Sequence, residues 1–203
     1  MVDPITLAAF IPAALVLNLT PGADMLFCLA QGMRSGNRAA LAASAGISTG
    51  SMVHVIIAGA GLSAIVSRIP GSFDIIRWVG VCYLLWLAAQ AVRQRNHQSN
   101  ACPLPARNAF CAGLFVNLTN PKVILFVLAF VPQFVTPDAG PVLAQFIVFG
   151  LVLAIGGFLI NGIVGIFASG LGARIARTSA ALGWATGSVF AALALRLAVM
   201  ERG

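Results

Sequence analysis

Apolar residues occur in six long stretches, and short polar segments separate them. The stretches cover residues 5–31, 39–66, 74–92, 109–134, 142–169 and 181–199. Each approaches or exceeds the roughly 20 residues that a helix needs to cross a bilayer. The pattern therefore predicts an all-α, polytopic membrane protein with six transmembrane helices. The first, second and fifth stretches are longer than a straight span requires, so we expect tilted or interrupted helices there.

The composition excludes several classes of protein. Of the 203 residues, 60% are hydrophobic and 8% are charged, whereas a soluble domain carries about 25% charged residues. A cytosolic enzyme, a nucleic-acid-binding protein and a disordered regulator are therefore excluded. The net charge of +7 does not indicate nucleic acid, because the arginines sit singly between apolar stretches and form no basic cluster.

The distribution of arginine predicts the orientation in the membrane. Loops 32–38, 93–108 and 170–180 hold seven arginines, and the opposite side of the membrane receives at most four. Basic residues accumulate on the cytoplasmic side, so both termini are predicted to be periplasmic. Residues 94–107 then form a cytoplasmic loop, in which Cys102 stays reduced.

An internal repeat divides the chain into two halves. The segment Asn18-Leu19-Thr20-Pro21 in the first stretch returns as Asn117-Leu118-Thr119-Asn120-Pro121 in the fourth stretch. We therefore predict one three-helix repeat in residues 1–93 and a second in residues 108–203. Three spans are an odd number, so the second repeat must be inverted relative to the first. Inverted repeats whose helices are interrupted at matching positions are typical of secondary transporters.

The two prolines predict a break in the first and fourth helices. Proline removes a backbone donor, so Pro21 should free the carbonyl of Leu17 and Pro121 that of Asn117. Proline also suits the first position of a new helix, and the residue before it, Thr20 or Asn120, is a good N-cap.

We therefore expect two half-helices that begin at these prolines near mid-membrane and face each other. Their converging positive ends favour an anion, and Gly22 lets the backbone approach a ligand closely. The alternative is a pair of proline kinks that only shape packing.

Two charged residues lie deep inside the predicted spans. Lys122 and Asp24 are candidates for a functional site, since a central charge costs about 3 kcal/mol or more on insertion scales. Lys122 and the helix ends suit a carboxylate, and Asp24 suits an ammonium group or a proton. The combination favours a zwitterion, meaning a free amino acid. The alternative, which does not exclude function, is a structural ion pair between Asp24 and Lys122.

His54 is a second candidate for handling protons. Gly46, Gly50, Ala58 and Gly61 fall on nearly the same stripe of its helix, and such small-residue stripes face other helices closely. His54 should therefore point into the bundle, either as a proton relay or as a neutral histidine bonded to backbone. For Asn161 in the fifth stretch, a hydrogen bond between helices is the better interpretation.

Other chemistry is poorly supported. Gly46-Ile47-Ser48-Thr49-Gly50 matches the GxSxG nucleophile pattern, but His54 lies about 240° around the same helix from Ser48 and cannot reach it. The four cysteines show no CxxC spacing, and a single intramembrane aspartate and histidine are too few for a metal site. We expect no enzyme, no cofactor and no metal. Gly183 and Gly187 serve either packing or a dimer face, so a homodimer stays open.

The motifs together resemble the LysE/RhtB family of bacterial amino-acid exporters. The resemblance covers nearly the whole chain. It rests on the segment from Asn18 to Asp24, on Gly32-x-x-x-Gly36, on Gly46-x-x-x-Gly50 and on the segment from Asn117 to Lys122. It implies a six-helix inner-membrane protein that exports amino acids or close derivatives in exchange for protons. Many members read Pro-Gly-Pro-Asn where this chain has Pro21-Gly22-Ala23-Asp24.

These arguments define the candidate residues and one rival function. The substrate-binding candidates are Asn18, Thr20, Pro21, Gly22, Asp24, Asn117, Asn120, Pro121 and Lys122. The proton-relay candidates are Asp24 and His54. The expected partners are an amino acid, protons and membrane lipid, without nucleic acid. The rival is a membrane protein with no transport function, such as a thiol-redox or assembly partner.

Overall fold

The computed structural model describes residues 2–66 and 103–168, with single residues between 78 and 89 and between 184 and 195. These residues form α-helices and short 3-10 helices, with no strand among them. The all-α class is therefore confirmed. Most of the third and sixth predicted spans lie outside the described residues, as do Cys102, Gly183, Gly187 and loop 170–180.

Among the described helices, two are single apolar spans and two pairs are bent. The single spans are α3 (Asn37–Val66) and α7 (Val142–Ile166). Helices α1 (Pro4–Leu19) and α2 (Ala23–Ser35) meet at 53°. Helix α5 (Ala106–Leu118) meets α6 (Pro121–Ala129), which the 3-10 helix η1 (Val131–Phe134) extends, at 54°. The predicted breaks in the first and fourth helices are therefore confirmed.

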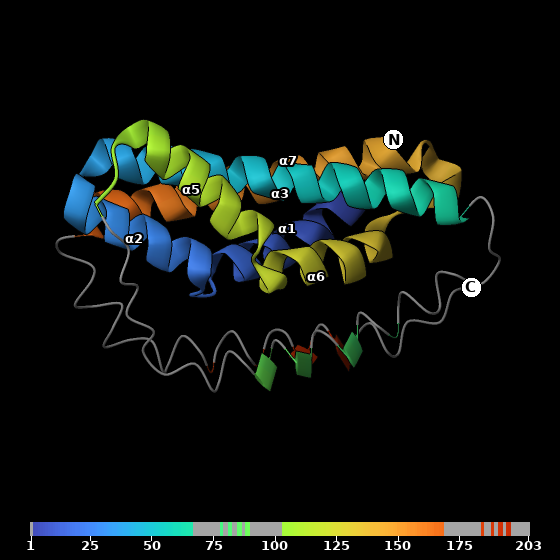
Figure 1. The fold of residues 1–203 in the computed structure, drawn as a ribbon. Helices are drawn as coiled ribbons and strands as arrows, with labels where there is room; N and C mark the ends of the chain where they lie inside the picture. The colour runs from blue at the N-terminus through green and yellow to red at the C-terminus, as the bar shows by residue number, and fades with distance from the viewer. Residues whose placement is uncertain are drawn as a thin grey trace.

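The two bent pairs run in opposite directions. In Figure 1 the chain passes from right to left along α1 and α2 and from left to right along α5 and α6. Helices α3 and α7 pack against each other, and both contact α2. This antiparallel placement of the motif-bearing helices is the one that inverted repeats require.

The connection between α2 and α3 is a single residue. Gly36 links Ser35 to Asn37 with φ of 81°, a left-handed conformation that glycine adopts without steric cost. Ser35 also holds the segment before α5, because its Oγ accepts a hydrogen bond from the Leu104 amide at 2.9 Å. The end of α2 is thus attached to the beginning of α5.

Helices α3 and α5 approach so closely that their contact positions need glycine. A Cβ atom built on Gly46 would lie 2.0 Å from the Phe110 carbonyl oxygen, and one on Gly113 would lie 2.4 Å from the Ala43 carbonyl oxygen. Gly50 faces the side chain of Asn117 in the same way. The predicted small-residue stripe is therefore confirmed at Gly46 and Gly50, whereas a Cβ built on Gly61 would meet no atom of the described residues within 4 Å.

We expect Gly46→Ala to weaken this packing. The added methyl group must displace the α5 backbone, and overpacking costs about 1–3 kcal/mol, which corresponds to about 2–12 °C in a protein of this size. The midpoint of thermal unfolding in detergent measures the effect. Gly61→Ala, in open space on the same helix, is the control, and an equal loss in both variants would contradict the close approach of α3 and α5.

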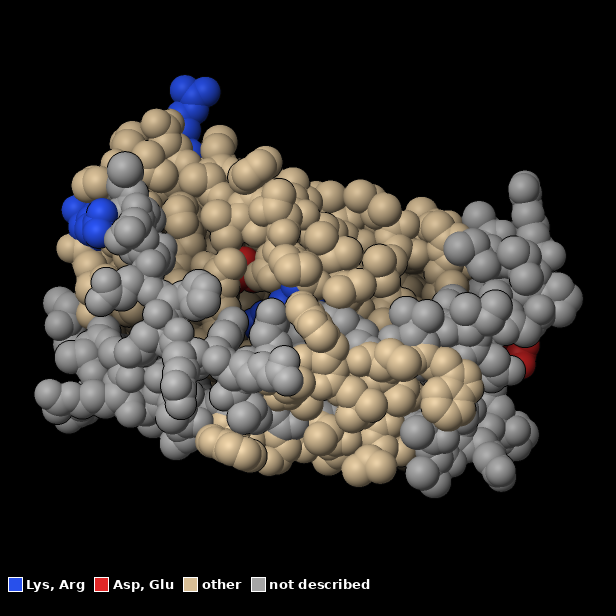
Figure 2. Space-filling model, turned by 60° about the horizontal axis from the view of Figure 1, so that its bottom comes forward, with Lys and Arg blue, Asp and Glu red and all other residues tan. Residues whose placement is uncertain are grey.

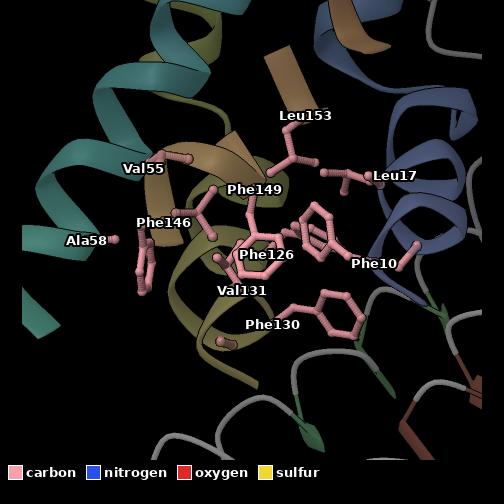
Figure 3. Close-up of a cluster of buried hydrophobic side chains, with 14 of the residues drawn as sticks. Phe10, Leu17, Val55, Ala58, Phe126, Phe130, Val131, Phe146, Phe149 and Leu153 are labelled. Atoms are coloured by element: carbon pink, nitrogen blue, oxygen red, sulfur yellow. The ribbon is translucent and has the colours of Figure 1, made fainter. Parts of the chain in front are cut away.

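Aromatic side chains fill the bundle at the end where α1 begins. The Phe10 ring lies 4.7 Å from the Phe149 ring and 5.2 Å from the Phe134 ring, measured between centroids. Phe126 and Phe130 of the α6 segment complete the group (Figure 3). A second buried cluster, of Phe27, Cys28, Ala39, Ala43, Ile47 and Ala109, lies at the other end of the bundle.

The outside of the bundle is apolar. Large hydrophobic side chains on several helices are more than half exposed, among them Ile57, Phe115, Ile155 and Ile163. Most of the described surface in Figure 2 is uncharged. In water such a surface would mark an interaction site, and on a bundle of apolar spans it is the surface that faces lipid.

Candidate functional site

The first break separates α1 from α2 by three residues. Thr20 ends α1, and its backbone amide donates to the Val16 carbonyl at 2.9 Å. Its hydroxyl also donates to the Val16 carbonyl. Helix α2 begins at Ala23 with Gly22 as its N-cap. The sequence-based expectation that the half-helix begins at Pro21 with Thr20 as N-cap is therefore wrong, because the Thr20 hydroxyl is directed back into α1.

The second break follows the expected capping pattern. Asn120 is the N-cap of α6, and its Oδ1 accepts a hydrogen bond from the Lys122 amide at 3.0 Å. Pro121 takes the first helical position. The two breaks thus share a proline but differ in capping, because Asn120 caps the helix that follows it, whereas the Thr20 hydroxyl bonds back into α1.

The two breaks meet inside the bundle. Lys122 reaches from α6 to the end of α1, where its ammonium donates to the carbonyls of Leu17 at 3.0 Å and of Thr20 at 2.9 Å. Asp24 of α2 accepts a hydrogen bond at Oδ2 from the Asn117 amide group at 2.9 Å. The predicted approach of the breaks is therefore confirmed by direct contacts in both directions.

These contacts refine two expectations, one about an ion pair between Asp24 and Lys122 and one about the space beside Gly22. The opposite charges of Asp24 and Lys122 attract each other, but the hydrogen bonds described above pair Asp24 with an amide and Lys122 with two carbonyls. The neighbour of Gly22 is the Lys122 ammonium, whose Nζ would lie 3.3 Å from a Cβ at that position. The missing side chain of Gly22 thus leaves room for Lys122.

A small cavity lies between the breaks and helices α3 and α7. Its volume is about 20 Å³, which suffices for about one water molecule and is too small for an amino acid. Its lining includes Asn18, Thr20, Asp24, Ser51, Lys122 and Asn161. Figure 2 shows acidic and basic atoms close together in a hollow that is bordered by uncharged atoms.

The apolar clusters border this cavity on both sides. Leu17, Val123 and Leu153 line the cavity and belong to the cluster around Phe10. Ile47 lines it from the second cluster. Apolar side chains of both clusters therefore border the cavity.

Asn117 is the centre of the polar contacts. Its side chain is fully buried and donates to Asp24, and its Oδ1 lies 3.4 Å from the Ser51 hydroxyl. Its carbonyl, which Pro121 frees, accepts hydrogen bonds from the Asn120 amide at 2.9 Å and from His54 Nε2 at 3.2 Å. His54 therefore points into the bundle as predicted, toward α5.

Three cavity-side residues were absent from the sequence-based candidates. Ser51 and Asn161 line the cavity, and Ser48 Oγ is buried without a hydrogen-bond partner. A Cβ on Gly157 would lie 3.3 Å from Asn18 Oδ1 and 3.9 Å from Ser48 Oγ, so both groups face the α7 backbone. Hydrogen bonds reach α7 from other helices: Asn18 donates to the Leu153 carbonyl at 3.2 Å, and Ser44 donates to the Phe158 carbonyl at 2.8 Å. The helical spacing of residues in the sequence of α3 and α7 could have shown that Ser51 and Asn161 lie on the inner faces of these helices.

Two buried polar atoms at the breaks have no hydrogen-bond partner. They are Asp24 Oδ1, an acceptor, and Asn120 Nδ2, a donor, in side chains that are 7% and 5% exposed and that lie close enough to interact with each other. A buried polar atom without a partner costs about 1–3 kcal/mol. A ligand with a cationic donor and an acceptor would satisfy both atoms.

Comparison with known proteins gives a consistent result. The family model described as LysE type translocator matches residues 15–201. A homoserine/homoserine lactone efflux protein from Salmonella typhimurium is 35% identical over 146 residues, which cover 70% of each chain. A leucine efflux protein from Klebsiella pneumoniae is 32% identical and covers 72% of this chain and 71% of its own length. No solved structure matches the chain.

Proposed function

Because the chain belongs to the LysE type translocator family, we propose that it is a secondary transporter that exports an amino acid or a close derivative from the cytoplasm, in exchange for protons. The family assignment and the apolar helices make it a multi-pass membrane protein. We assign it no catalytic step and no cofactor. The observation that carries the proposal is the meeting of two broken helices around Asp24, Asn117 and Lys122.

The proposed binding site uses residues of both breaks. Asp24 Oδ1 receives the α-ammonium group of the substrate, and Asn120 Nδ2 donates to its carbonyl oxygen. The positive charge of Lys122 and the amino-terminal end of α6 favour a substrate carboxylate. Asn18, Thr20, Pro21, Gly22 and Pro121 shape the two breaks.

The substrates named for the relatives fit this division of roles. Leucine, homoserine and homoserine lactone share an α-ammonium group, whereas the lactone has no free carboxylate. A site that recognises leucine, homoserine and homoserine lactone must depend most on the side chain that binds the α-ammonium group. In this chain that partner is Asp24, and Ser51, Ser48 and Asn161 lie where a polar substrate side chain would point.

Export requires the cavity to open toward each side in turn. The cluster around Phe10 borders the cavity on one side, and the second cluster, which contains Phe27 and Ile47, borders it on the other. We expect alternating access to separate one cluster at a time. Asp24 carries the exchanged proton in this scheme, since an ammonium group and a proton compete for the same carboxylate. His54 relays the proton or, alternatively, only holds the Asn117 carbonyl.

We propose that the protein lies in the bacterial inner membrane with both termini in the periplasm. A variant that keeps Cys102 but carries serine at Cys28, Cys82 and Cys111 tests this orientation. An impermeant maleimide should label Cys102 in inside-out vesicles and leave it unlabelled in intact cells. Labelling of intact cells would contradict the proposed orientation.

A binding screen tests the class of substrate. Purified protein is heated in detergent with each common amino acid, with homoserine and with homoserine lactone. A substrate binds the folded state and should raise the midpoint of unfolding as its concentration increases. If none of these compounds gives a saturable increase, while the protein unfolds cooperatively, the result favours a membrane protein without amino-acid transport.

A further inference from the structure

The carbonyl end of α1 is occupied by a cation from the other half of the chain. Pro21 leaves the Leu17 carbonyl without a helical donor, and Thr20 follows the end of the helix. The Lys122 ammonium donates to both carbonyls, at 3.0 and 2.9 Å. It therefore lies at the negative end of the α1 dipole, where a positive charge is stabilised.

This arrangement has the ligands of a monovalent-cation site. Unwound carbonyls and the carbonyl ends of half-helices coordinate Na⁺ in secondary transporters. Here Leu17, Thr20 and Asp24 line one cavity, and the negative charge of Asp24 attracts the Lys122 ammonium. Gly22 leaves space beside the cation, since a Cβ there would lie 3.3 Å from Nζ.

The second break is capped in a related way. Pro121 frees the Asn117 carbonyl, and His54 of α3 donates to it at 3.2 Å. Each half of the chain therefore supplies a side-chain donor for the carbonyl that proline frees in the other half. The donor at the first break, the Lys122 ammonium, carries a full positive charge. The donor at the second break, His54, can donate with either a neutral or a charged ring.

We propose that the Leu17 and Thr20 carbonyls form a monovalent-cation site near the negative charge of Asp24, and that the Lys122 ammonium is its resident cation. The lysine is tethered, so the site is filled without a dissolved metal ion. The coupling of the proposed exporter is then independent of Na⁺. This consequence rests on the proposed function, whereas the site itself is tested below without transport.

Replacing the tethered cation should create a site for dissolved cations. In Lys122→Ala the carbonyls lose their donor and a cavity opens, so we expect the midpoint of unfolding to decrease by about 5 °C or more. Propylammonium and Na⁺ should restore part of this loss in a saturable manner, and choline at the same ionic strength should not. Lys122→Met fills the space with an uncharged chain, so neither cation should restore it.

The wild-type protein should show the same midpoint in sodium and in choline chloride. The proposal is wrong if sodium, propylammonium and choline affect Lys122→Ala equally, or if Lys122→Met recovers as much as Lys122→Ala. These outcomes are independent of any amino-acid transport, so they do not depend on the proposed function.

A second measurement needs no variant, because Lys122 is the only lysine in the chain. Protein labelled with ¹⁵N at the lysine Nζ should give one side-chain signal, at the shift of a charged ammonium group, with protons that exchange slowly with solvent. A signal from a neutral amine, or proton exchange as fast as in free lysine, would overturn the proposal even if Lys122→Ala does not fold.

Discussion

Asp24→Asn should reduce the affinity for an α-ammonium substrate by about 10- to 100-fold, because a hydrogen bond to a charged group contributes about 1.5–3 kcal/mol. Asparagine has the same shape and keeps an oxygen that accepts from Asn117, so we expect little change in the stability of the unliganded protein. The variant also restores the residue that many family members have at this position. Binding of some substrate should therefore persist, and the dependence of transport on pH should change.

Titration of the purified protein with the substrate found in the screen measures the affinity. Asp138→Asn, a change of an exposed carboxylate outside the cavity, is the control and should bind like the wild type. Unchanged affinity together with an unchanged pH profile in Asp24→Asn would show that the carboxylate is structural.

Asn117→Leu should be among the most destabilising single changes in the described part of the chain. The side chain is fully buried, and it donates the 2.9 Å hydrogen bond to Asp24. Leucine has a similar size but no donor, so it leaves a buried carboxylate without this partner. We expect the free energy of unfolding in mixed micelles to decrease by about 3 kcal/mol.

The repeat supplies a matched control for this change. Asn18 is the counterpart of Asn117, and its amide donates to a neutral carbonyl at 3.2 Å. Asn18→Leu should therefore cost about 1 kcal/mol. In an Asp24→Leu background the cost of Asn117→Leu should decrease by about 1–3 kcal/mol. Additive losses from Asp24→Leu and Asn117→Leu would contradict the interaction between the two breaks.

The positions of the breaks follow from local chemistry. Proline at positions 21 and 121 has no amide proton to donate, so the helices end close to these residues whatever surrounds them. The apolar stretches likewise predicted the ends of the described spans to within about five residues. The start of α2 was missed because Thr20 donates its hydroxyl to Val16. Sequence alone does not decide between this bond and a cap on the next helix.

The partners inside the site depend on packing between distant helices. The sequence identified Asp24 and Lys122 and left an ion pair between them open. Which carbonyls receive the ammonium depends on how far α1 and α6 approach. The contributions of Ser51 and Asn161 depend on how α3 and α7 are rotated, which the close contacts at Gly50 and Gly157 determine. These contacts join residues that are far apart in the sequence.

Exchange in proteoliposomes tests the central claim most directly. Vesicles containing the purified protein are loaded with the substrate found in the screen, and its release is followed with and without a pH gradient across the membrane. We expect the wild type to release the amino acid faster when the pH gradient draws protons in the opposite direction, and Asp24→Asn to lose this acceleration. Release that is equal in protein-free vesicles, or equally accelerated in wild type and Asp24→Asn, would contradict a proton-coupled exporter centred on the two helix breaks.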